Sequence, residues 1–248
     1  MNIIKEIVSS QSHINIHGNN HKILVIPDTH IPYQDNNSIK KTLEIGKRFN
    51  PDIIVLLGDI IDCVSISRFV KRTDERDFNT EVKSTRKFLE YIRNTFKQSL
   101  FYYLEGNHEE RITNYLLTHA DALATLEELS LPSLLHLKEL GIVFLSKEKT
   151  LQIGKLTYTH GQICKGICST FPARALYLSA KTNAICGHAH RQSSYCCRSL
   201  TGEVFRTYST GCLSILNPSY SVFNDFTAGC AIIETDNKGE FDVQLKSV

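Results

Sequence analysis

The chain has 248 residues, of which 42% are hydrophobic and 22% are charged, so it is long enough to bury a large core. It contains no apolar run of about 18 residues, so we expect no membrane-spanning helix and no membrane partner. A formal net charge of +2 argues against a surface dedicated to nucleic acid and leaves room only for a local basic patch.

The N-terminal segment has no basic stretch followed by an apolar one, so we expect no secretory signal and a cytoplasmic location. We therefore predict that the eight cysteines are reduced structural thiols. Two close pairs invite a zinc interpretation, but neither has the paired C-x2-C spacing of such sites. These pairs are Cys164 with Cys168 and Cys196 with Cys197.

The first 21 residues alternate polar and apolar side chains, and Gly18-Asn19-Asn20 predicts a hairpin turn. Three histidines in this segment could form a metal cluster, but they follow no buried strand. A solvent-exposed edge strand is the favoured interpretation for His13, His17 and His21.

A β-α-β unit is predicted from residue 22 onwards. Residues 22–27 and 53–57 are short apolar runs typical of strands that are buried on both faces. Between them, N-cap candidates at 35–37 begin an amphipathic helix that Pro51 ends. Such a unit nearly always gives a parallel strand pair with a right-handed crossover.

A charged connector over 65–78 precedes an amphipathic helix, whose apolar residues recur every three or four positions from Val82 to Phe96. An apolar strand follows at 100–104. Residues 109–140 are expected to be a largely helical insertion, with a final helix that begins at Pro132 and ends at Gly141.

After Gly141 the pattern changes to short strands separated by turns, with one helix that Ser169 or Thr170 caps and that runs to Ala180. No linker or low-complexity segment interrupts the chain, so we predict one domain over residues 1–248. The expected strands are 142–145, 151–153, 156–159, 184–186, 193–200, 204–208, 230–234 and 241–245.

Five predicted strands end in side chains that commonly bind metals. Each motif alone is typical of an ordinary turn, but all five directly follow an apolar run. Because strand ends of an open α/β sheet meet at one crevice, we expect these side chains to converge. The motifs are Asp28-Thr29-His30, Gly58-Asp59-Ile60-Ile61-Asp62, Gly106-Asn107-His108, Thr159-His160-Gly161 and Gly187-His188-Ala189-His190.

Hard oxygen ligands combined with imidazole nitrogens suit Mn, Fe, Zn or Ni. The five strand ends supply two aspartates, one asparagine and four or five histidines as candidate ligands. One metal takes about four protein ligands, so about seven candidates predict two ions that share a bridging carboxylate. Only the two aspartates would be anionic, so two divalent ions would leave net positive charge. That charge predicts a phosphate substrate rather than a neutral ester.

This ordered set of motifs, spanning residues 23–190, resembles the calcineurin-like metallophosphoesterases. The resemblance implies an α/β fold, a β-sandwich of two sheets flanked by helices in four α/β/β/α layers. It implies two divalent ions, Mn²⁺ first and Fe, Zn or Ni as alternatives, with Asp59 as the bridge. The first ion would be held by Asp28, His30 and His190, and the second by Asn107, His160 and His188.

His108 is left outside the ligand set, and we predict that it is the general acid that protonates the leaving oxygen. The resemblance implies that Asp62 orients this histidine and that Glu109 supports the loop. The residues 131–141 are similar to a subgroup of phage and bacterial members, most of them without an assigned substrate. Basic side chains near the motifs are candidate phosphate contacts: Arg68, Arg111, Lys165 and Arg191.

The favoured function is a metal-dependent phosphomonoesterase or phosphodiesterase that acts on a small phosphorylated compound or nucleotide. Cys63-Val64 follows Asp62 where the protein-phosphatase branch has Arg-Gly, which disfavours a phosphoprotein substrate. The double-strand-break nucleases of the family have Asp where this chain has Glu109, and they carry a DNA-capping domain for which this chain has no spare residues. Both differences disfavour a duplex exonuclease.

Two alternatives stay open. A nuclease of the same metal chemistry, acting on single-stranded DNA or RNA, predicts a basic stripe near Arg68 to Arg76. A non-catalytic binding module is the other alternative, although such proteins lose ligands and none is missing here. No sequence feature indicates an oligomeric state.

Overall fold

The computed structural model describes residues 13–17, 20–69, 77–164, 170–218 and 223–248. Within these residues, two six-stranded sheets pack against each other. The first has the order β12 (Phe241–Ser247), β11 (Gly229–Thr235), β2 (Lys22–Ile26), β3 (Ile53–Leu56), β4 (Leu100–Leu104), β5 (Ile142–Leu145). The second has the order β1 (His13–Ile16), β6 (Thr150–Ile153), β7 (Leu156–Tyr158), β8 (Ala184–Cys186), β10 (Val204–Thr210), β9 (Gln192–Arg198).

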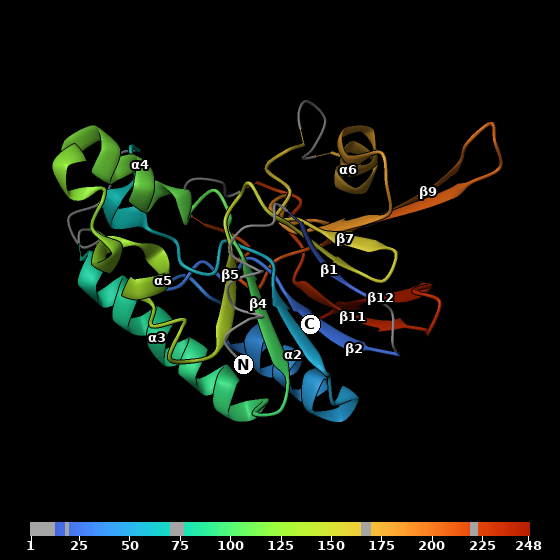
Figure 1. Cartoon of the computed structure of the whole chain (residues 1–248), viewed down its shortest axis with the longest axis horizontal. Helices are drawn as coiled ribbons and strands as arrows, with labels where there is room; N and C mark the ends of the chain where they lie inside the picture. The colour runs from blue at the N-terminus through green and yellow to red at the C-terminus, as the bar shows by residue number, and fades with distance from the viewer. Residues whose placement is uncertain (1–12, 18–19, 70–76, 165–169, 219–222) are drawn as a thin grey trace.

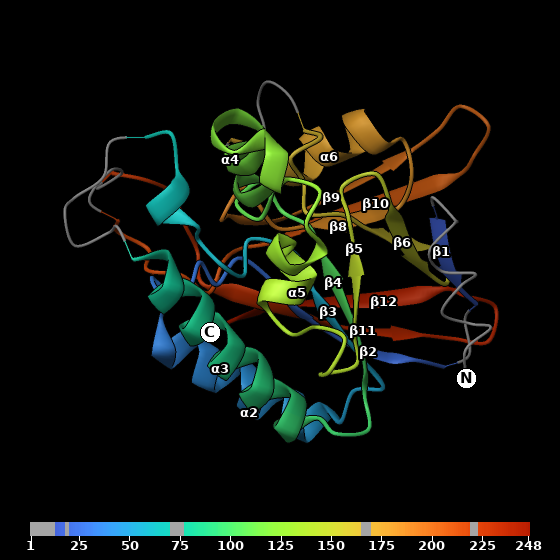
Figure 2. The same cartoon turned by 60° about the vertical axis from the view of Figure 1, so that its left-hand side comes forward.

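Helices cover the outer face of each sheet, as the views in Figures 1 and 2 show. Two long helices, α2 (Asn36–Phe49) and α3 (Phe78–Thr95), pack on the first sheet. α6 (Pro172–Ala180) packs on β8, β9 and β10 of the second sheet. The four layers confirm the predicted α/β/β/α sandwich.

The apolar runs of the sequence form two of the core layers. Successive side chains of a strand point to opposite faces. Ile23 and Val25 of β2 therefore enter the core between the sheets, where Tyr158 of the second sheet is also buried. Leu24 and Ile26 lie in the other layer, against α2 and α3. The central strands are thus buried on both faces, as their continuous apolar runs predict.

Three predictions about local structure are wrong. β1 and β2 do not form a hairpin, because β1 pairs in parallel with β6 of the other sheet. Gly18 and Asn19 lie outside the described residues. In the 109–140 region, the helices are α4 (Glu110–His119), η3 (Asp121–Leu123), η4 (Glu127–Leu129) and α5 (Leu131–Leu134).

The helix expected from Pro132 to Gly141 therefore ends at Leu134. Its backbone turns away at His136, which has a φ of 53°, a left-handed conformation that no α-helix continues. The start of α6 also differs from its prediction. Pro172 occupies its first turn and Phe171 precedes it without a side-chain cap, so Thr170 is not the cap. Ser169 lies outside the described residues.

No disulfide joins the seven cysteines in the described part of the chain, and Cys168 lies outside it. None of the described helices is both long and apolar enough to cross a bilayer. The extent of the domain over residues 1–248 stays a prediction.

Candidate metal centre

The five motifs meet at one edge of the sandwich. β2, β3 and β4 run parallel in the first sheet, and β7 and β8 run parallel in the second, so their carboxyl ends lie together. Backbone hydrogen bonds tie the loops to one another: the His30 N–H donates to the Asp59 carbonyl at 2.9 Å. The His188 N–H donates to Asp28 Oδ1 at 2.9 Å and joins the two sheets.

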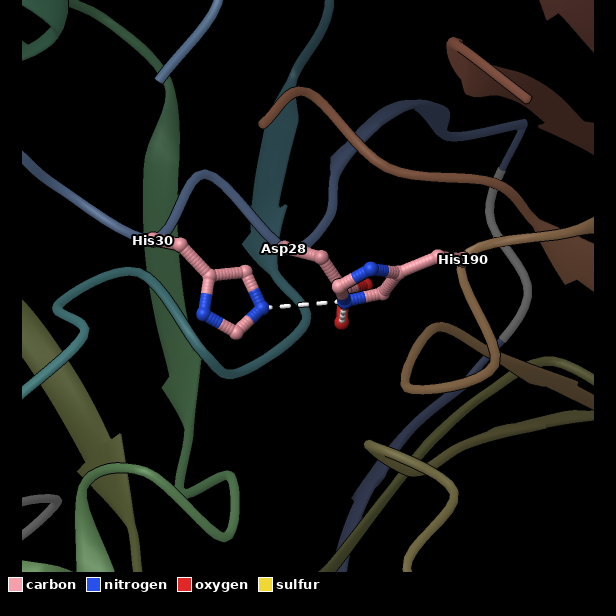
Figure 3. A group of neighbouring side chains, drawn as sticks. All are labelled: Asp28, His30 and His190. Carbon is pink, nitrogen blue, oxygen red and sulfur yellow. Dashed lines mark hydrogen bonds and ion pairs between the residues drawn. The ribbon is translucent and has the colours of Figure 1, made fainter. Parts of the chain in front are cut away.

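Asp28, His30 and His190 form one group of buried side chains, shown in Figure 3. The Nε2 atoms of His30 and His190 are 2.9 Å apart, and His190 Nε2 is 3.4 Å from Asp28 Oδ1. Asp28 Oδ2 and His190 Nδ1 are buried and find no hydrogen-bond partner among the described residues. A buried carboxylate oxygen without a partner is costly, and a bound cation would satisfy it.

A second group surrounds His160. Its Nε2 lies 3.1 Å from Asn107 Oδ1, 3.2 Å from His188 Nδ1 and 3.2 Å from Asp59 Oδ2. Its Nδ1 is 2.9 Å from the Leu57 carbonyl, which fixes the ring. Asp59 Oδ2 also lies 3.6 Å from His30 Nε2 of the first group, so this carboxylate stands between the two groups.

The backbone at these positions is strained in a way that sequence does not reveal. Five of the seven candidate ligands have a positive φ, which is uncommon for residues other than glycine. Each such conformation costs about 1–3 kcal/mol, and such residues cluster at functional sites. The angles are 32° at Asp28, 48° at His30, 50° at Asp59, 63° at His188 and 53° at His190.

The charges around the groups favour a cation. Burial lowers the pKa of His160, but the Asp59 carboxylate outweighs burial and raises it to about 10. The pKa of Asp59 lies well below its usual range because, against the opposing effect of burial, His160 and other imidazoles surround it. Burial and then the neighbouring His160 lower the pKa of His188 to about 4. His188 is therefore neutral near pH 7, whereas His160 holds a proton beside Asp59. A bound cation would take the place of that proton, because a metal ligand must be neutral.

His108 and Asp62 lie beside these groups. His108 Nδ1 is 2.8 Å from the Asp62 carbonyl and 3.3 Å from Asp62 Oδ2, while Asp62 Oδ2 is also 3.0 Å from His30 Nδ1. His108 Nε2 points towards Asp59 Oδ2, at 3.8 Å. Burial lowers the pKa of His108, but the charges of Asp59 and Asp62 outweigh it and raise the pKa above its ordinary value.

The three residues His30, Asp62 and His108 are also close enough to share a metal. In this group, however, Asp62 faces Nδ1 of His30, whereas Nε2 of the same ring faces Asp59 and His190. This geometry is that of a carboxylate that orients an imidazole. The oxygen and imidazole donors, the orphaned Asp28 oxygen and the central Asp59 together fit two divalent ions of the transition series.

Glu109 holds the loops that carry the motifs. Its buried carboxylate accepts the backbone N–H groups of Asp59 at 2.9 Å and Ile60 at 2.8 Å. It also accepts the N–H of Gly106 at 2.9 Å and the Tyr103 hydroxyl at 2.7 Å. The expected supporting role of Glu109 is confirmed.

Gly187 leaves the space that the Asp28 side chain occupies. A Cβ atom at this position would collide with Asp28 Oδ2. We expect Gly187→Ala to displace that carboxylate and weaken Mn²⁺ binding by about 10- to 100-fold, the usual effect of disturbing a ligand's support. Calorimetric titration with Mn²⁺ measures the change. Gly141→Ala is the control for backbone strain away from the site: its φ is 66°, but a Cβ there meets nothing within 4 Å. Equal affinity losses in the two variants would contradict this explanation.

The structure places the basic residues that were candidate phosphate contacts in different surroundings. Arg111 lies inside the site: its Nη2 is 3.0 Å from His108 Nε2 and its Nη1 donates to the Asp62 carbonyl at 2.9 Å. Arg191 instead pairs with Asp225 at 2.9 Å. Arg68 is exposed, with its guanidinium 5.4 Å from the Phe69 ring. Lys165 lies outside the described residues, as do Lys71, Arg72 and Arg76 of the expected basic stripe.

A pocket of about 170 Å³ beside His160 is a feature that sequence analysis missed. Its wall combines the apolar Ile163 with the polar Gln162 and the charged Glu105 and Lys147. The only sequence signal was proximity: these residues follow or precede the ends of strands that carry the motifs. Within the described residues, none of the metal-binding groups includes His13, His17 or His21.

Fold and site together define a class of protein, the α/β sandwiches that gather Asp, Asn and His on the strand ends of two packed sheets. The sequence profile of the calcineurin-like phosphoesterases matches residues 21–210, and the chain belongs to this family. It is similar to the Gene 54 protein of Mycobacterium phage L5, with 31% identity over 180 residues that cover 69% of each chain.

Solved structures with related folds have low sequence identity. A Vps29 variant from Entamoeba histolytica is 11% identical, covers 92% of this chain and 99% of its own, and superposes with a TM-score of 0.46. A dimetal phosphatase from Danio rerio is 11% identical with the same coverages and a TM-score of 0.45.

Proposed function

We propose that the protein is a dinuclear-metal phosphoesterase that hydrolyses a phosphate monoester or diester. One observation carries the proposal. Seven ligand-type side chains from five strand ends form two groups around Asp59, and an oriented imidazole, that of His108, stands beside them. Asp28, His30, Asp59 and His190 would hold one ion, and Asp59, Asn107, His160 and His188 the other.

Two bound divalent ions, Mn²⁺ in our proposal, would supply a nucleophile from water near neutral pH and offset the charge of a phosphate. The remaining chemistry belongs to the chain. The contact between His108 Nδ1 and the Asp62 carbonyl requires a proton on Nδ1, because a carbonyl only accepts. Nε2 is therefore the atom that faces the site, and we propose that it protonates the leaving oxygen.

Arg111 has a place in the same step. Its guanidinium Nη2 lies 3.0 Å from His108 Nε2, the atom that we propose as the proton donor. Because a guanidinium only donates, Nε2 accepts in this contact and carries no proton there. An arginine fork matches phosphate oxygens well, so we propose that a substrate phosphate takes over the Arg111 donor and frees Nε2 to hold the proton that it transfers. Arg68 is a weaker candidate, because its contact in the structure is with Phe69.

The substrate we propose is a small phosphorylated compound or nucleotide. The pocket beside His160 supports the small end of this size class, since its volume of about 170 Å³ is below the roughly 300–1,000 Å³ of typical ligand pockets and its walls are both apolar and hydrogen-bonding. Nothing in the described residues favours a single-stranded nucleic acid, whose binding calls for a basic groove with stacking platforms.

An assay panel tests the proposal. The Mn²⁺-loaded protein is incubated with p-nitrophenyl phosphate, bis-p-nitrophenyl phosphate, cyclic nucleotides and labelled single-stranded DNA, with chelator-treated protein as the control. We expect metal-dependent hydrolysis of at least one of the small esters. Cleavage of DNA alone would establish the nuclease instead, and hydrolysis of nothing by protein with two bound ions would establish a binding module.

A further inference from the structure

Glu81 is a buried carboxylate that the chemistry described so far does not use. It lies in the first turn of α3, and the whole residue is only 3% exposed. Its two oxygens accept the N–H of Val64 at 3.0 Å and the N–H of Ser65 at 2.9 Å, and the Ser65 hydroxyl as well. Burial raises the pKa of this carboxyl, so placing a charge here is costly.

The groups that Glu81 binds belong to a short helix that cannot cap itself. η1 (Val64–Ile66) begins after Cys63, which makes no capping hydrogen bond through its side chain. Cys63 has a φ of 55° and is fully buried, so the chain turns sharply between Asp62 and Val64. Glu81 supplies, from another helix, the acceptors that the first turn of η1 lacks.

Asp62 therefore lies between two backbone segments whose N–H groups are bound by buried carboxylates. On its N-terminal side, Glu109 accepts the N–H groups of Asp59 and Ile60. On its C-terminal side, Glu81 accepts those of Val64 and Ser65. The Asp62 N–H itself donates to the Ile31 carbonyl at 2.9 Å. The backbone of Asp62 is thus fixed before, at and after the residue.

This fixation matters because Asp62 supplies the contacts to His108 Nδ1, which set the orientation of the ring. Its carbonyl and its carboxylate both lie within hydrogen-bond range of His108 Nδ1, at 2.8 and 3.3 Å. A small rotation of the Asp62 backbone would move both acceptors together. Misplacement of a reacting group by about 1 Å can cost about 10²-fold in rate.

We propose that Glu81 is a positioning residue for hydrolysis: by clamping the backbone that follows Asp62, it aims His108 at the leaving oxygen. This inference rests on the function proposed above. It assigns Glu81 no contact with substrate or metal, and it predicts that the effect of Glu81 on kcat at saturating Mn²⁺ passes mainly through His108. Asp62 also contacts His30 Nδ1 at 3.0 Å and the Arg111 guanidinium at 2.9 Å, so metal content and KM are measured beside kcat.

A double-mutant cycle tests this route. Glu81→Gln keeps the shape of the side chain but replaces one acceptor oxygen by an NH₂ group. This group is a donor and cannot accept the backbone N–H that the oxygen accepted. At saturating Mn²⁺ we expect it to lower kcat by about 10-fold with KM within about two-fold. In a His108→Asn background the same change should lower kcat by less than about two-fold, because the group it positions is gone.

A purely structural role gives a different pattern. Equal losses in the two backgrounds, or a wild-type kcat in Glu81→Gln, would overturn the proposal. Ser99→Ala is the matched control: it removes a buried hydrogen bond from the Ser99 hydroxyl to the Pro51 carbonyl, remote from Asp62, and should lower stability without lowering kcat. Ser65→Ala leaves the carboxylate and two of its donors and should give an intermediate kcat.

The inference and the proposed function can fail separately. If the wild-type protein hydrolyses no phosphoester, the function fails and the cycle has no readout. A crystal structure of Glu81→Gln then decides the inference alone. Displacement of the Asp62 carbonyl from His108 Nδ1 would support it, and an unchanged contact would overturn it.

Discussion

Asp59→Asn is expected to lower hydrolysis of p-nitrophenyl phosphate by about 10³-fold or more and to reduce metal binding at both groups. Asp59 Oδ2 lies within 3.6 Å of ring nitrogens of His30 and His160, one from each group. Asparagine keeps the shape and removes the negative charge that holds a cation between the groups. Metal content after equilibrium dialysis, measured by mass spectrometry, and steady-state turnover give the two readouts.

The matched control for this charge removal is Asp242→Asn, an exposed aspartate in β12. It should keep two ions and wild-type turnover. An Asp59→Asn protein that still binds two ions with unchanged affinity would show that Asp59 does not bridge, and the shared-carboxylate arrangement would be wrong.

His108→Asn should lower kcat by about 10²- to 10⁴-fold and leave both ions bound. The asparagine amide can still donate to the Asp62 carbonyl in place of Nδ1, but it has no proton to give to a leaving oxygen. The comparison is made by turnover at saturating substrate together with metal content. Loss of an ion from this variant would count against the general-acid assignment, since His108 would then be a ligand.

The pH dependence of wild-type turnover follows from the same residue. A general acid works only when protonated, and the charges of Asp59 and Asp62 raise the pKa of His108 above 6.5 despite burial. Turnover should therefore fall as pH rises through that raised pKa. The alkaline fall should be absent in His108→Asn, and an identical profile in the two proteins would assign it to another group.

The central β strands and the motif positions were predictable from sequence because each rests on a local pattern. A continuous apolar run marks β2, β3 and β4, and parallel strands place the residues after them at one edge. The partner of β1 was not predictable, because a short, half-polar edge strand is paired by long-range packing. The end of α5 was missed because Gly141 predicts a helix end, whereas the backbone already turns at His136, a residue type that gives no such signal.

In the candidate site, too, local patterns were predictable and features that depend on the whole fold were not. Asp28, Asp59 and His160 could be found from their place after strands, whereas their strained backbone and mutual distances required the fold. The phosphate contact of Arg111 stays a prediction, and the structure adds its contact with His108 Nε2 at 3.0 Å. Glu81 carried no signal at all, because an acidic residue in a helix's first turn is ordinary.

Anomalous diffraction from crystals grown with Mn²⁺ tests the central claim most directly, because it locates ions independently of any substrate. We predict two peaks in the anomalous map, one among Asp28, His30 and His190 and one among Asn107, His160 and His188, with Asp59 touching both. A single peak, or an ion held by Asp62 and His108, would contradict the dinuclear centre.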